Sequence, residues 1–137
     1  MGGPRTAGEV SVGRVLVVDD DRVQLELVGH LLKRQGIAAS CCLSGDAALR
    51  LVECEQYAAV VTDYQMPAMN GIEFIRALRR RCPALPVVLV SAQLTDEVRR
   101  EALAAGAAGA FRKPTTLVEL LALLAGMVRE GSPAAVQ

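Results

Sequence analysis

Aspartates, a serine and a lysine close four apolar runs of the chain, and these residue types could together form an ion-binding site. In chain order they are Asp19, Asp20, Asp21, Asp63, Ser91 and Lys113. Carboxylates that gather in one cleft repel one another, and a divalent cation removes that repulsion. If the four runs are neighbouring strands, they build an acidic cation site with a hydroxyl and an ammonium beside it.

The elements that must position these residues are strands and helices that alternate along the sequence. Apolar runs predict strands at 14–19 and 38–43, a third ending at Asp63, a fourth at 86–91, and a less apolar fifth at about 109–113. Helical spacing of apolar residues predicts helices at about 21–35, 45–55, 72–81 and 96–105, and a last one from Thr116. Ser44 and Thr95 are suitable N-caps, and Gly36 and Gly106 suit the ends of the helices that precede them.

This alternation predicts an α/β fold. We expect a flavodoxin-like (βα)5 three-layer sandwich, in which a doubly wound parallel sheet of five strands carries helices on both faces. In the strand order 2-1-3-4-5 the first and third strands are neighbours, which brings Asp19, Asp20 and Asp63 together. Ser91 and Lys113 then arrive on the two adjoining strands.

Composition fits one domain with an aliphatic core. Of the 137 residues 52% are hydrophobic but only 3% aromatic, so Val, Leu, Ile and Ala must fill the core, as suits helices packed on a parallel sheet. Residues 14–130 are predicted to form this domain, and the Gly- and Pro-containing stretches 1–13 and 131–137 are predicted to be flexible tails.

Charge and cysteine usage restrict the partners and the compartment. The formal net charge is zero, which gives no electrostatic reason to expect nucleic acid or a membrane as partner. The four cysteines lack the spacing of a metal site and the density of a disulfide scaffold. With no signal-like N-terminus and no apolar run long enough to span a bilayer, we expect a cytoplasmic protein.

Taken together, these motifs resemble the receiver domain of two-component response regulators, the group that includes chemotaxis regulators. The resemblance covers about residues 14–129 and depends on Asp19-Asp20, Asp63, the Met-Pro-Ala-Met-Asn-Gly stretch 66–71, Ser91-Ala92 and Lys113-Pro114. Each motif is short, whereas their joint order is specific.

The resemblance implies a bacterial signalling protein. Its phosphoryl group would come from a phosphohistidine on a sensor histidine kinase or a histidine phosphotransfer protein, and it would then present an altered surface to a downstream protein. Such a domain assists its own phosphorylation and dephosphorylation and is not an enzyme acting on another substrate.

By this resemblance Asp63 is the phosphoacceptor. Asp20 and Asp63 would bind Mg²⁺ directly, the backbone carbonyl of Gln65 would complete the protein ligands, and Asp19 would act through water. Mg²⁺ suits such a site because it prefers oxygen ligands and usually keeps several waters. Mn²⁺ is an alternative.

The resemblance also assigns the groups around the phosphoryl position. Lys113 would pair with Asp63 before the reaction and with a phosphoryl oxygen afterwards, and Ser91 and Ala92 would bind the phosphoryl group. The bond between Lys113 and Pro114 is expected to be cis, an isomer that only proline makes accessible at low cost. Gln65 and Gln93 would flank the path of a hydrolysing water and tune the lifetime of the phosphoryl group.

One position departs from the family pattern. Receivers commonly carry Tyr or Phe three residues before the lysine, and this chain has Ala110. Phe111 is adjacent, but strand alternation points it to the opposite face of the sheet. We therefore expect the output to depend on movement of the loop from Ser91 to Thr95.

Other functions remain open at the level of sequence. The stretch 19–23, Asp-Asp-Asp-Arg-Val, also fits the nucleophile loop of haloacid-dehalogenase-like phosphatases, with Asp19 as nucleophile of a Mg²⁺-dependent phosphohydrolase. That alternative leaves Asp63 unexplained, and no acidic pair follows Lys113. A further alternative is a receiver-fold adaptor that docks without phosphorylation. The chain could be a stand-alone regulator or the receiver part of a hybrid histidine kinase.

Overall fold

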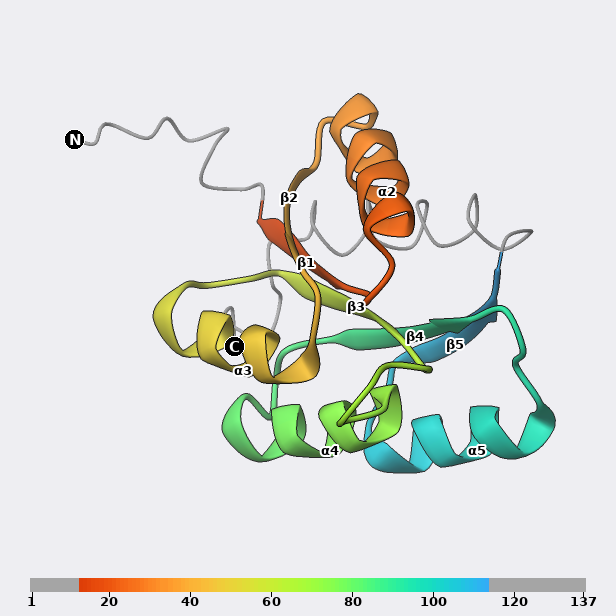
Figure 1. The fold of residues 1–137 in the computed structure, drawn as a ribbon. Coiled ribbons are helices and arrows are strands. Elements are labelled where there is room, and N and C mark those ends of the chain that lie inside the picture. The colour runs from red at the N-terminus through yellow and green to blue at the C-terminus, as the bar shows by residue number, and fades with distance from the viewer. Residues whose placement is uncertain (1–12, 114–137) are drawn as a thin grey trace.

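The computed structural model describes residues 13–113, in which strands and helices alternate (Figure 1). The elements are β1 (Arg14–Val18), α2 (Arg22–Arg34), β2 (Ala38–Cys42), α3 (Gly45–Cys54), β3 (Ala59–Asp63), α4 (Gly71–Arg81), β4 (Val87–Ser91), α5 (Asp96–Ala105) and β5 (Gly109–Arg112). The predicted tails, Pro114 and the helix expected from Thr116 lie outside the described residues.

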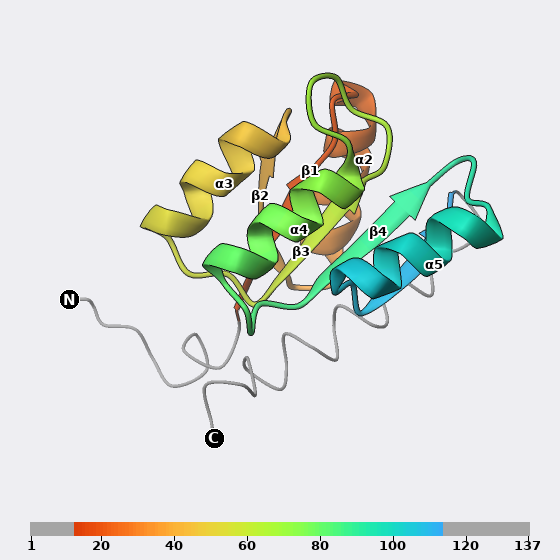
Figure 2. The same cartoon turned by 90° about the horizontal axis from the view of Figure 1, so that it is seen from below.

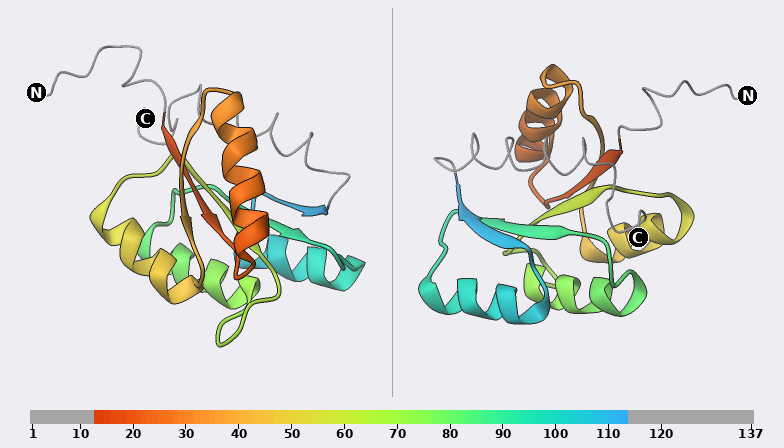
Figure 3. Two further views of the ribbon diagram at one scale, coloured as in Figure 1. Left: turned by 45° about the horizontal axis from the view of Figure 1, so that its top comes forward. Right: turned by 180° about the vertical axis from the view of Figure 1, so that it is seen from behind.

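The five strands form one parallel sheet in the order β2-β1-β3-β4-β5, which confirms the predicted topology. Helix α2 covers one face, and α3, α4 and α5 lie side by side on the other (Figures 1 to 3). Val18 of β1 is level with Thr62 of β3, and Asp63 is level with Val90 of β4. The carboxyl ends of these three central strands therefore meet at one edge of the sheet.

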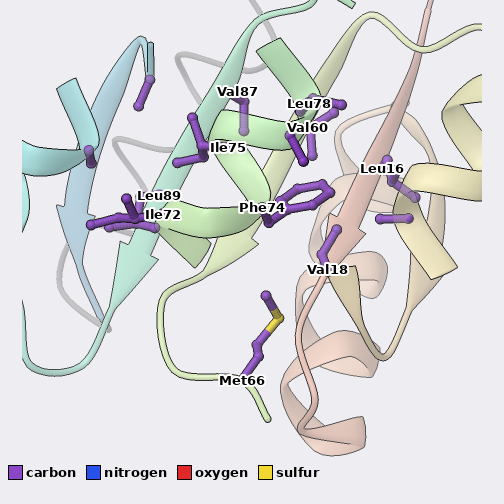
Figure 4. Close-up of a cluster of buried hydrophobic side chains, with 14 of the residues drawn as sticks. Leu16, Val18, Val60, Met66, Ile72, Phe74, Ile75, Leu78, Val87 and Leu89 are labelled. Carbon is purple, nitrogen blue, oxygen red and sulfur yellow. The ribbon is translucent and has the colours of Figure 1, made fainter. Parts of the chain in front are cut away.

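A buried aliphatic cluster lies on each face of the sheet. Leu25 and Leu32 of α2 pack on one face, and the larger cluster under α3, α4 and α5 surrounds the buried ring of Phe74 (Figure 4). At about 25 cal/mol per Å² of apolar surface removed from water, this burial is the main favourable contribution to the fold. It fixes the strand ends that carry the polar residues.

Local side-chain hydrogen bonds set the helix starts. Asp21, Ser44 and Thr95 are N-caps, and Gly106 ends α5 with a left-handed φ of 115°. Helix α4 begins with a capping box in which Asn70 and Glu73 each accept the other's backbone N–H, a signal that the sequence prediction missed. No helix among residues 13–113 has the length and hydropathy needed to cross a membrane.

Candidate functional site

Three carboxylates meet where β1 and β3 end. Each of Asp19, Asp20 and Asp63 offers an oxygen, and these oxygens lie within 4.8 Å of one another. Asp19 is buried, Asp63 is half-buried and Asp20 is exposed, so the cluster opens outward on the Asp20 side. Asp21 does not join it, because its carboxylate caps α2 by accepting the N–H of Val23 at 2.9 Å.

Lys113 brings one positive charge into this cluster. Its Nζ lies 2.9 Å from Asp19 Oδ2 and 3.3 Å from Asp63 Oδ1. Sequence reasoning paired this lysine with Asp63, and the structure adds Asp19 as the nearer partner. The shared partner keeps two neighbouring carboxylates close together despite their like charge.

The ionisation of this group follows from burial and from these neighbours. Burial raises the pKa of Asp63, and the charge of Asp19 raises it further, although Lys113 opposes both effects. Burial by itself would lower the pKa of Lys113, but the hydrogen bond to Asp19 and the charges of Asp63 and Asp19 outweigh it and raise that pKa. The ammonium is therefore held charged, while the charge on Asp63 is only partly compensated.

The hydroxyl of Ser91 is buried at the end of β4, the strand next to Asp63. Its Oγ accepts the backbone N–H of Gln93 at 3.2 Å, and its carbonyl accepts the N–H of Lys113 at 3.0 Å. Ala92 and Gln93 follow on the exposed side of the loop. The predicted phosphoryl-binding residues thus lie beside the acidic cluster, on the strand between β3 and β5.

The loop after Asp63 forms one wall of a shallow hollow. Its lining residues are Asp20, Tyr64, Gln65, Met66, Pro67 and Asn70. Gln65 therefore shares this hollow with the exposed carboxylate of Asp20. Ala68 in the same loop has a φ of 70°, a left-handed conformation that costs a residue with a Cβ about 1 kcal/mol or more.

Two residues support Asp63 in roles that the sequence did not predict. Thr62 is fully buried, and its Oγ1 donates to the carbonyl of Asp63 at 2.9 Å. Gly71 packs so closely that a Cβ there would lie 2.3 Å from the same carbonyl oxygen. The sequence motif 66–71 includes Gly71, but the contact that requires glycine depends on how α4 returns to the end of β3.

The position that lacks an aromatic ring is closely packed. Ala110 is 2% exposed and belongs to the cluster under α3, α4 and α5. Phe111 packs in the cluster on the α2 face, so the expected alternation is confirmed. Its ring lies across the sheet from Ala110 and cannot take the missing place.

Known proteins identify the family. The model of the response regulator receiver domain matches residues 15–125, most of the chain. The chain belongs to this family.

Relatives and solved structures agree with the assignment. The receiver is 35% identical over 119 residues to the transcriptional regulatory protein TctD of Salmonella typhimurium, covering 87% of this chain and 53% of TctD. It is 36% identical over 120 residues to the response regulator MprA of Mycolicibacterium vanbaalenii, covering 88% and 52%. The chain thus spans about half the length of these curated relatives.

Among solved structures, the receiver domain of the Francisella response regulator 1452 has a TM-score of 0.80 and 28% identity. That likeness covers 86% of this chain and 98% of the other.

Proposed function

We propose that this receiver accepts a phosphoryl group on Asp63 from a phosphohistidine of a sensor histidine kinase or a histidine phosphotransfer protein. The observation that supports this most directly is the cluster of Asp19, Asp20 and Asp63 with the ammonium of Lys113 at its inner side. Phosphoryl transfer is catalysed chiefly by positioning and by compensation of charge, and this cluster offers both.

Asp63 is better placed than Asp19 to be the acceptor. Asp19 Oδ1 accepts the N–H of Asp21 at 3.0 Å, its Oδ2 accepts from Lys113, and the residue is 5% exposed. Asp63 is the more open of the two, beside the hollow along the following loop. A donor can therefore approach Asp63 while Asp19 supports the site from beneath.

The donor set fits Mg²⁺, with Mn²⁺ as the alternative. All three carboxylates supply hard oxygen ligands at short mutual separation, which is the chemistry that Mg²⁺ prefers. Asp20 and Asp63 would hold it directly, with the carbonyl of Gln65 and, through water, Asp19. When bound, the cation supplies positive charge that offsets the carboxylates and the incoming phosphoryl oxygens.

The protein groups then have separate tasks in the transfer. A lone pair of an Asp63 carboxylate oxygen forms the new O–P bond, and the electrons of the N–P bond leave with the donor's imidazole nitrogen. Lys113 would turn from Asp63 to a phosphoryl oxygen, and the Ser91 hydroxyl and the Ala92 backbone N–H would donate to others. Water later attacks the phosphorus, the O–P bond to Asp63 breaks, and inorganic phosphate leaves the restored carboxylate, at a rate that Gln65 and Gln93 would tune.

The downstream partner is proposed to be a protein that reads the surface near α5 and β5. Because Ala110 offers no ring to swing inward, the signal would pass through the loop from Ser91 to Thr95. The formal net charge of the receiver is zero, so net charge gives it no electrostatic attraction to nucleic acid or to a membrane.

Phosphorylation by acetyl phosphate with Mg²⁺, followed by intact-protein mass spectrometry, tests the acceptor assignment. We expect the wild type and the matched control Asp46→Asn to gain one phosphoryl group, because Asp46 is exposed in the first turn of α3 and does not belong to the cluster. Asp63→Asn should gain none, and a chelator should abolish labelling of the wild type.

The same experiment separates the rival functions. A phosphohydrolase with Asp19 as nucleophile predicts that Asp63→Asn still takes up phosphate and that Asp19→Asn does not. An adaptor that works without phosphorylation predicts no labelling of the wild type under any condition. Either result would refute the proposal.

A further inference from the structure

The loop that follows Ser91 is tied to β5 at both of its ends. At the near end the backbone N–H of Lys113 donates to the carbonyl of Ser91 at 3.0 Å. At the far end Nη2 of Arg112 donates to the carbonyl of Leu94 at 2.7 Å. Leu94 itself is 3% exposed, so the end of the loop is anchored by its side chain and by its carbonyl.

A second arginine joins α5 to β5 at the position of the missing ring. Nη1 of Arg99 donates to the carbonyl of Ala110 at 2.7 Å. Ala110 and Leu94 belong to the same buried cluster, which also includes Ala102 of α5. The two guanidinium-to-carbonyl hydrogen bonds therefore brace the loop, α5 and β5 against one another, and bonds from a charged donor are stronger than neutral ones.

Arg112 and Lys113 are neighbours in the chain, but their side chains contact different parts of the molecule. The side chain of Lys113 reaches Asp63 and Asp19, whereas that of Arg112 reaches the loop end just before Thr95, the N-cap of α5. A change in the partners of Lys113 thus occurs one residue away from Arg112, whose guanidinium holds the loop end at the start of α5.

We propose that Arg112 is a positioning residue that couples the phosphoryl site to α5, with Arg99 as the second part of the brace. This inference rests on the proposed function, since it takes movement of Ser91 toward a phosphoryl group as its input. While Leu94 is held on β5, the loop cannot absorb that movement internally. The displacement passes to the start of α5, and this brace takes the place of an aromatic residue at position 110.

Backbone amide NMR with Mg²⁺ and beryllofluoride, a phosphoryl mimic, tests the coupling. In the wild type we expect shifts at Ser91 and also at Thr95 and Asp96. In Arg112→Met, which keeps the length of the side chain but removes its donors, the shifts at Ser91 should remain. Those at Thr95 and Asp96 should fall several-fold, because the loop end then loses the charged hydrogen bond that holds Leu94 on β5.

Matched variants separate positioning from a general loss of structure. Arg112→Lys keeps a charged donor and should retain much of the α5 response. Arg100→Met removes an exposed arginine of α5, the helix that carries Arg99, and should behave as the wild type. If Arg112→Met does not give a folded spectrum, Arg99→Met provides the same comparison, and its α5 response should also fall.

The outcomes distinguish the two proposals. A full α5 response in Arg112→Met, or in Arg99→Met where that variant is used, overturns the brace and leaves phosphorylation of Asp63 standing. A wild type that responds at Ser91 but not at Thr95 and Asp96 does the same. A wild type with no response at Ser91 overturns the proposed function, and the brace with it.

Discussion

A single methyl group added at Gly71 should displace the backbone of Asp63. The Cβ of Gly71→Ala would lie 2.3 Å from the carbonyl oxygen of Asp63, 2.7 Å from Leu89 Cδ1 and 3.0 Å from Tyr64 Cα. The leucine tip can turn aside, but the other two atoms belong to the backbone that ends β3. Relief of the contact must therefore move α4 or the end of the strand that carries Asp63.

The change in unfolding free energy of Gly71→Ala is the cost of overpacking minus the gain in helix propensity. Forcing an extra carbon into a packed site costs typically about 1–3 kcal/mol. The alanine returns less than about 1 kcal/mol of helix propensity, because Gly71 is the first residue of α4. We expect Gly71→Ala to lose about 1–2 kcal/mol of unfolding free energy, and the rate of labelling by acetyl phosphate to fall with the misplaced carboxylate.

Urea unfolding and the labelling rate are both compared with a matched control. Gly29→Ala adds the same methyl group within α2, where its Cβ would lie 3.6 Å from Cys41 Sγ, an ordinary contact. That variant should gain about 0.5–1 kcal/mol from helix propensity and label as the wild type does. If Gly71→Ala were as stable as the wild type and labelled at the same rate, the reasoning about this contact would be refuted.

Three further predictions concern ionisation and strain. Folding raises the pKa of Asp63, so the protein loses stability as pH rises from the ordinary carboxyl pKa through the raised one. In urea unfolding at neutral pH without divalent cations, Asp63→Asn should therefore be more stable than the wild type. Ala68→Gly should gain about 1 kcal/mol in the same assay, because glycine adopts the φ of 70° without the clash of a Cβ, and an unchanged midpoint would contradict the strain. Burial raises the pKa of Cys42 to about 11, which leaves about one thiolate in a thousand at pH 8. Mass-resolved alkylation should therefore modify exposed Cys54 well before Cys42, and equal rates would contradict this.

The strand ends were predictable because each is marked by a signal within a short stretch of sequence. An apolar run that stops at a polar residue reports the end of a buried strand, and the right-handed crossover rule then limits the order of the strands. Predicted and observed strand boundaries differ by about one residue, as is usual for element ends. At the end of β1, for example, Asp19 lies outside the strand, yet its N–H still donates to the carbonyl of Cys42 at 3.1 Å.

Contacts between distant segments were the part that the sequence did not reveal. The choice of Asp19 as the nearer partner of Lys113 depends on how β5 lies relative to β1, because β3 and β4 separate these two strands in the sheet. The braces from Arg99 and Arg112 depend on rotamers of long side chains, which have no periodic signature in the sequence. The capping box at Asn70 was different, because Asn-x-x-Glu before an apolar run is a readable signal.

The charge balance of the cluster connects its geometry with its proposed cation. Among residues 13–113, one ammonium, that of Lys113, contacts this cluster of three carboxylates, through Asp19 and Asp63, so two negative charges are formally left over within one small volume. Burial raises the pKa of Asp63 and the charge of Asp19 raises it further, so the ammonium of Lys113 does not fully offset the cost of ionising Asp63. A divalent cation supplies the charge that is missing, on the side where Asp20 is exposed. The same deficit that destabilises the free receiver would therefore make binding of Mg²⁺ favourable, and under the proposed function that cation would lie where the phosphoryl group approaches Asp63.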